Sequence, residues 1–126
     1  MQINSNLKTA FRFNASFSTL CAIWLLSASN WWALQFGLSD GLLIQIGGVG
    51  LMVFAGYLVW LSSTKKQPKA SINSVIYSDW AYVIAALIAA IVAWGAISDV
   101  GASFLITTSI IVAIAAEWQR RAAFNS

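Results

Sequence analysis

Long apolar runs alternate with short polar segments along the chain, and this pattern divides the sequence. Four uncharged stretches are long enough, or nearly so, to cross about 30 Å of hydrocarbon at about 1.5 Å per residue. They cover residues 13–38, 41–61, 80–97 and 100–116. The pattern predicts an all-α protein, a bundle of four transmembrane helices, with no separate soluble domain.

The polar segments group these stretches into two helical hairpins. Residues 64–78 hold the only proline, Pro68, together with Ser, Lys and Asn, and predict a solvated linker. Hairpin 1 then covers about 12–63 and hairpin 2 about 79–119. Each half consists of a span, a Ser-Asp turn and a second span, which suggests an internal duplication. The Ser-Asp pairs at 39–40 and 98–99 precede helices and are expected to cap them.

The stretch "SASNWWALQFGLSDG", residues 27–41, allows two interpretations. In the first, helix one crosses from about residue 12 to 30, and residues 31–38 lie along the outer interface, where Trp rings are favoured. In the second, one long tilted helix continues through them. The run after Lys8 and Arg12 also has the pattern of a signal peptide, but Ser18 stands where a lipoprotein signal ending at Cys21 has Leu. Residues 12–38 are therefore expected to belong to the mature protein.

The positions of the basic residues predict the topology. All seven Lys and Arg lie before the first span, between the second and third, or after the fourth, and the other two loops carry none. Under the positive-inside rule, both termini and the linker are cytoplasmic, in a bacterial inner membrane. The basic residues that produce the net charge of +3 are thus explained by the orientation of the chain in the membrane. Scattered basic residues form no groove for a phosphate backbone, so no nucleic-acid partner is expected.

The amino-acid composition argues against several kinds of metal and redox site. The chain is 60% hydrophobic and 9% charged, with no His and one Cys. Haem ligation through imidazole, His-based zinc sites and CxxC redox chemistry therefore need residues that the sequence lacks. We expect no metal and no cofactor. No nucleophile, base and orienting group can be assembled from these residues, so the protein is expected not to be an enzyme.

Small residues recur at helical spacing and predict where helices approach closely. Both second helices carry them every seven positions, and the third span carries Ala at intervals of four. Helices embedded in lipid pack through small side chains rather than through hydrophobic drive. The predicted packing residues are Gly48, Ala55, Ala85, Ala89 and Ala115.

Three polar residues are candidates for a ligand or ion site: Asn14, Asp79 and Glu117. Asp79 is expected at the start of the third span and Glu117 near the end of the fourth, at similar depth, while Asn14 begins the first span. One interpretation is a carboxylate site for a cation or proton. The other is a helix cap at Asp79 and an ion pair between Glu117 and the arginines three and four residues later.

Several short runs carry a family resemblance: "FNASFSTLCAIWLL", "GLSDGLLIQIGGVGLMVFAGYLVWL", "SDWAYVIAALI" and "AAEWQRRA". They resemble a family of small, functionally uncharacterised bacterial four-helix integral membrane proteins. The matching positions are Asn14, Phe17, Gly50, Asp79, Trp80 and Gln119. The resemblance implies a four-helix membrane fold and brings no activity with it.

Two functions fit these observations. The first is a non-enzymatic integral membrane protein that acts through helix packing, as an accessory subunit, a homo-oligomer or a lipid-binding module. Its partners are membrane lipids and either itself or another membrane protein. The second is a small transporter or channel with a cytoplasmic-side polar site near Asp79 and Glu117. Small multidrug transporters carry a Glu within the first helix, and this chain has none there. A close-packed bundle favours the first function, and a polar cleft beside the carboxylates favours the second.

Overall fold

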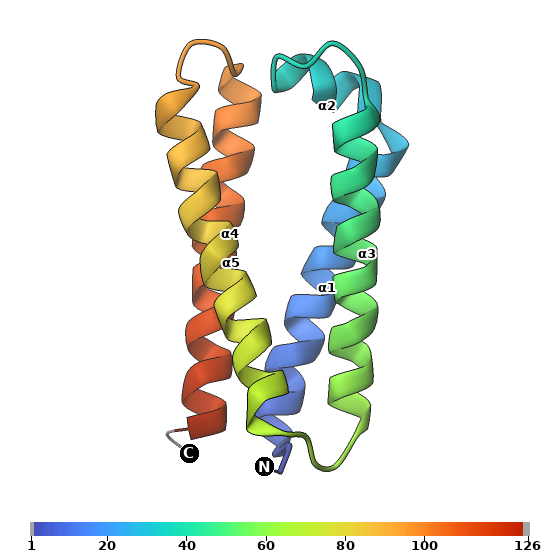
Figure 1. Cartoon of the computed structure of the whole chain (residues 1–126), viewed down its shortest axis with the longest axis vertical. Helices are drawn as coiled ribbons and strands as arrows, with labels where there is room; N and C mark the ends of the chain where they lie inside the picture. Colours follow the sequence, from blue (N-terminus) through green and yellow to red (C-terminus); the bar gives the residue numbers. More distant parts are fainter. Residues whose placement is uncertain (1, 125–126) are drawn as a thin grey trace.

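The computed structural model describes residues 2–124, and this part of the chain is helical with no strand. Its five helices are α1 (Ser5–Ser27), α2 (Ser29–Gln35), α3 (Leu42–Ser63), α4 (Lys69–Val92) and α5 (Asp99–Phe124). The long helices form two hairpins, α1 with α3 and α4 with α5, and the short α2 lies across one end (Figure 1). The all-α prediction is confirmed.

Among the described residues, three helices are long and apolar enough to cross a membrane, α3, α4 and α5, where the sequence predicted four spans. The helix that falls short is α1. Its first half carries Lys8, Arg12 and Asn14, and it ends at Ser27 because the backbone of Ala28 leaves helical geometry, with φ −127° and ψ 38°. The apolar part of α1, residues 13–27, is about 22 Å long at about 1.5 Å per residue. The uncharged run over 13–38 is therefore not one continuous span.

The region after the break forms an element of its own. Since α2 is a separate helix, a single long helix through residue 38 is excluded, and the predicted change of direction is confirmed. The prediction of an interfacial segment does not hold for Trp32, since its side chain is buried, with 1% exposed, whereas its neighbour Trp31 is 44% exposed. The Trp32 ring packs 4.5 Å from that of Phe104, between ring centroids. The turn of α2 over the bundle thus points one of the two adjacent indoles inward.

The connection between the hairpins is shorter than predicted. Only residues 64–68 separate α3 from α4, so most of the predicted linker over 64–78 is helical. Pro68 occupies the N-cap position of α4, where its missing N–H costs no helical hydrogen bond. The predicted capping at the other loops is confirmed for Asp40 and Ser98. Asp40 accepts a bond of 3.0 Å from the Leu42 N–H, and Ser98 accepts one of 3.1 Å from the Gly101 N–H.

The small-residue seams of α3 and α5 are buried along their whole length: Gly41, Gly48, Ala55, Ser62, Gly101, Thr108, Ala115 and Ala122. A Cβ at Gly48 would lie 2.7 Å from Cγ of Leu26, which is too close for two carbon atoms. The close approach of α1 and α3 at this point therefore requires a glycine. The seam predicted for α4 is wrong in register. Ala85 is exposed and Ala89 half-buried, while Ala86 and Ala90 are buried. The buried face of α4 is instead the row that runs from Ile72 through Asp79 to Ala90.

The core has two parts, one at each end of the bundle. At the end that holds both termini (Figure 1), α1, α3, α4 and α5 all contribute to one cluster: Leu7, Phe11, Ala15, Ala55, Leu58, Leu61, Ile72, Val75, Ile76 and Ala122. At the other end a smaller cluster, Leu25, Trp32, Ala33 and Ile44, joins α1, α2 and α3, with Phe104 of α5 packed against it.

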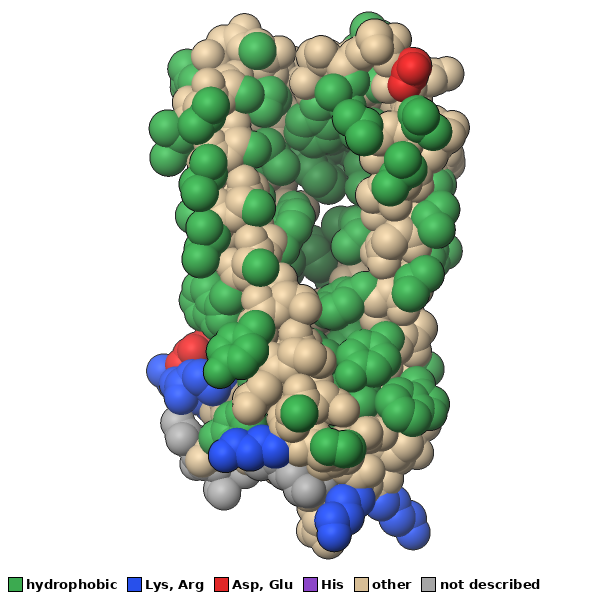
Figure 2. Space-filling view, viewed as in Figure 1, with side chains coloured by type: hydrophobic (Ala, Val, Ile, Leu, Met, Phe, Trp, Pro, Cys, Tyr) green, Lys and Arg blue, Asp and Glu red, His purple; other side chains and the backbone are tan. Residues whose placement is uncertain are grey.

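Between these clusters the hairpins separate. The two hairpins contact each other mainly through α1 and α5, while α3 and α4 diverge toward the far end (Figure 1). The far end is tied again by Gln35, which accepts hydrogen bonds from both the hydroxyl and the backbone N–H of Ser98. Figure 2 shows the resulting hollow between the two halves.

Candidate functional site

A buried polar triad links three helices above the larger hydrophobic cluster. The Asn14 amide of α1 donates to Oδ2 of Asp79 at 2.8 Å and to Oε1 of Gln119 at 3.0 Å. The Gln119 amide of α5 donates to the same Asp79 oxygen at 2.8 Å. Asp79 is 3% exposed, Asn14 1% and Gln119 0%. A carboxylate buried to this degree requires such donors, because isolated charge is expensive in an apolar interior.

The position of Asp79 contradicts its predicted role as a helix cap. Helix α4 begins at Lys69, so Asp79 lies about 15 Å along it at about 1.5 Å per residue. Its carboxylate bonds with side chains of other helices rather than with free N–H groups of its own. The structure brings two of the three candidate residues, Asn14 and Asp79, into direct contact through their hydrogen bond.

Glu117 does not belong to this cluster. Its carboxylate faces outward, where it accepts hydrogen bonds from Arg120 and, at 3.1 Å, from Arg121 on the same helix. The ion-pair interpretation of Glu117 is therefore confirmed. The polar residue of α5 that reaches Asp79 is Gln119, two positions later, because two residues rotate a helical side chain to the opposite side of the axis.

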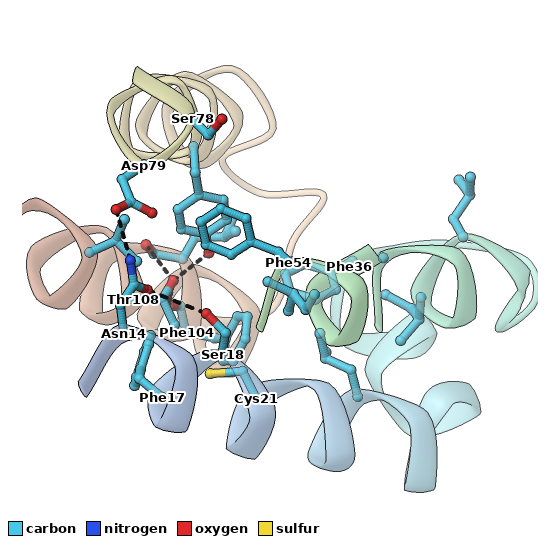
Figure 3. A pocket seen from close by; sticks show the side chains of 18 residues that line it. Asn14, Phe17, Ser18, Cys21, Phe36, Phe54, Ser78, Asp79, Phe104 and Thr108 are labelled. Atoms are coloured by element: carbon cyan, nitrogen blue, oxygen red, sulfur yellow. Dashed lines mark hydrogen bonds between the residues drawn. The ribbon is translucent and has the colours of Figure 1, made fainter. Parts of the chain in front are cut away.

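Asp79 also borders a cavity of about 380 Å³ between the hairpins. The cavity walls are mostly apolar, built by Phe17, Leu25, Leu43, Gly47, Leu51, Phe54, Phe104 and Val112 together with other side chains of α1, α3 and α5. Its polar side chains come from α1, α4 and α5: Asn14, Ser18, Ser78, Asp79, Tyr82 and Thr108. Figure 3 shows Asn14, Asp79 and Thr108 on one side of the space and Phe54 and Phe36 on the other.

A second hollow of about 490 Å³ lies between α1 and α5. It shares Phe17, Cys21, Phe104 and Thr108 with the first, so these four side chains border both hollows. Trp24 of α1 lines this second hollow and packs edge-on against Trp32, with ring centroids 5.0 Å apart. It serves the aromatic packing of the α2 end.

Comparisons with protein-family models, with curated proteins and with solved structures find no match for this chain. The resemblance to small four-helix membrane proteins thus stays a prediction. The positions that carry it nevertheless include all three members of the triad, Asn14, Asp79 and Gln119. The site is defined by its geometry alone.

Reasoning from individual residues missed Gln119 and Tyr82 as members of the site. The available signal was helical spacing. Tyr82 follows Asp79 by three residues, which places both on one face of α4. Gln119 follows Ala115 by four residues on α5 and so continues its buried seam.

Proposed function

We propose that the protein is a non-enzymatic integral membrane protein that binds one amphipathic ligand in the cavity between its hairpins. The observation that carries this proposal is the combination of a largely apolar cavity with a buried carboxylate at its polar side. A volume of about 380 Å³ falls in the range of about 300–1,000 Å³ that is typical of small-molecule pockets. An apolar body fits the walls, and a polar head reaches Asp79.

Membrane insertion is supported by the surface. Large apolar side chains are exposed along the bundle, among them Leu34, Val53, Ile91 and Val92, and hydrophobic side chains cover the long sides in Figure 2. Lys and Arg side chains gather in this view near the end that holds both termini, which supports the proposal that this end is cytoplasmic. We infer that α1 inserts with the other long helices, because it packs along α3.

The ligand-binding proposal is a specific form of the predicted lipid-binding module. It differs from a bundle that acts through packing alone, since such a bundle has no use for a carboxylate beside an open cavity. A transporter would need the same cavity to reach the terminal end, where four helices close-pack around Leu58 and Leu61. The geometry therefore favours a binding protein, and the partner is a membrane amphiphile.

A cavity-filling substitution tests the proposal. Gly47 lines the cavity, and a Cβ there meets no atom within 4 Å, so Gly47→Phe fills the space without a backbone clash. Gly56 of the same helix is equally free of neighbours within 4 Å but lies outside the cavity lining. Gly56→Phe is therefore a matched control for the gain in helix propensity that both changes bring.

The probe is dodecanol carrying a photoreactive diazirine in its chain, applied to the protein in dodecyl maltoside. We expect saturable labelling that excess dodecanol removes and that maps to the cavity faces of α1, α3 and α5. Labelling should be lost in Gly47→Phe and retained in Gly56→Phe. Non-saturable labelling of equal extent in all three proteins would show only surface contact and would overturn the proposal.

A further inference from the structure

The hydroxyl hydrogens around the cavity are already used within the protein. The Thr108 hydroxyl donates to the Phe104 carbonyl at 2.7 Å, so the Tyr82 hydroxyl, 2.6 Å from Thr108, is the donor between these two side chains. Ser18 donates to Oδ1 of Asn14 at 3.4 Å, and Ser78 donates to the Ser74 carbonyl at 2.7 Å. These hydroxyl oxygens therefore offer the cavity lone pairs and no hydrogens.

The amide hydrogens of the triad are unavailable as well. Both hydrogens of the Asn14 amide are donated, to Asp79 and to Gln119. Gln119 is fully buried and is not part of the cavity lining. Apart from the weak thiol donor of Cys21, the cavity walls thus present acceptors.

The strongest of these acceptors is the second oxygen of Asp79. Both amide bonds to Asp79 end on Oδ2, and within residues 2–124 no hydrogen bond ends on Oδ1. Among the same residues, the only fully enclosed side-chain polar atom without a partner is Nε1 of Trp32. Oδ1 is therefore not sealed in protein, and Asp79 reaches the cavity with one oxygen free (Figure 3).

The lining contains no Lys and no Arg, and Asp79 is its one charged residue. An anionic head, such as a carboxylate or a bare phosphate, would meet lone pairs and a like charge there. An ammonium group supplies the missing hydrogens and an opposite charge, and charge-assisted bonds of this kind are the stronger ones.

We infer that the cavity selects a single-chain amphiphile with a primary ammonium head, held by Oδ1 of Asp79 and by the lone pairs of Tyr82 and the serine hydroxyls. This inference rests on the proposed function and names its ligand class. The head can belong to a free alkylamine or to an amine-bearing lipid. The absence of Lys and Arg from the lining favours the free amine, since a lipid phosphate would find no cation beside it.

The test compares competitors against the same photoreactive dodecanol in the wild-type protein. Dodecylamine, dodecanol and dodecanoate share a chain and differ in the head. We expect dodecylamine to compete on the order of tenfold to a hundredfold better than dodecanol, the range for a hydrogen bond to a charged group, and dodecanoate to be weakest. Equal competition by amine and alcohol, or strongest competition by dodecanoate, would overturn the ammonium inference and leave cavity binding standing. If none of the three competes, the proposed function itself fails.

Asp79→Asn supplies the second arm. In this variant the side-chain oxygen can keep both amide donors, while an NH₂ group takes the place of the free oxygen. The advantage of dodecylamine over dodecanol should disappear in this variant. A retained advantage in folded Asp79→Asn protein contradicts the assignment to Asp79. Lysophosphatidylethanolamine as a fourth competitor shows which molecule carries the ammonium head. If it competes less well than dodecylamine, the ligand is a free amine. If it competes better, the ligand is a lipid with an amine headgroup.

Discussion

Removing the Asn14 amide should be among the most damaging single changes in the bundle. In Asn14→Ala, Oδ2 of Asp79 keeps one of its two donors, and Oε1 of Gln119 loses the donor at 3.0 Å. The first lost bond involves a charged acceptor and is worth about 1.5–3 kcal/mol, and the second is neutral and worth about 0.5–1.5 kcal/mol. The expected loss in the free energy of unfolding is therefore about 2–4.5 kcal/mol.

The assay is reversible unfolding in mixed micelles of dodecyl maltoside and SDS, followed by tryptophan fluorescence. Ser16→Ala is the matched control, because Ser16 is exposed on the same helix and should change stability by less than about 0.5 kcal/mol. Asn14→Asp adds a second test, since it keeps the shape but places a carboxylate beside Asp79. It should be at least as destabilising as Asn14→Ala at neutral pH. Stability of Asn14→Ala within error of Ser16→Ala would refute the triad as a source of stability.

Two further predictions concern packing and topology. Gly48→Leu should lower the free energy of unfolding by about 1–3 kcal/mol, because its Cβ would lie 2.7 Å from a side chain of α1. Val53→Leu, at a site 69% exposed, should leave it nearly unchanged. Unfolding in the same mixed micelles measures both variants, and equal tolerance would mean that the α3 seam is no interface. For topology, single cysteines at exposed Ser39 and Lys66 are made in a Cys21→Ser background. An impermeant thiol reagent outside intact cells should label the first and spare the second, and the reverse pattern would invert the proposed orientation.

The sequence predicted the features that depend on periodicity. Each of the four long helices overlaps one of the long apolar runs, since sustained burial or exposure to lipid demands such runs. The seven-residue spacing of small residues located the seams of α3 and α5, because close helix approach excludes larger side chains at those positions. The end of the first helix was also predicted, at about residue 30, and lies at Ser27.

Features decided by tertiary contacts could not be predicted in the same way. Polar residues 69–78 read as a linker, yet Ile72, Val75 and Ile76 dock onto the other three long helices, and this packing makes the segment helical. Once α4 starts at Lys69, Asp79 is interior, and the register of α5 then decides whether Glu117 or Gln119 faces it. The residue pattern of one helix taken alone does not show which of these two side chains faces Asp79.

The triad also has a consequence for assembly. Asn14 and Gln119 are 105 positions apart in the chain, and Asp79 lies between them. During synthesis, the first hairpin is therefore complete while Asn14 still lacks both of its partners. The last helix to be made takes part in two of the three bonds, so in a chain truncated before α5 the Asn14 amide and the Asp79 carboxylate each lack one hydrogen-bond partner.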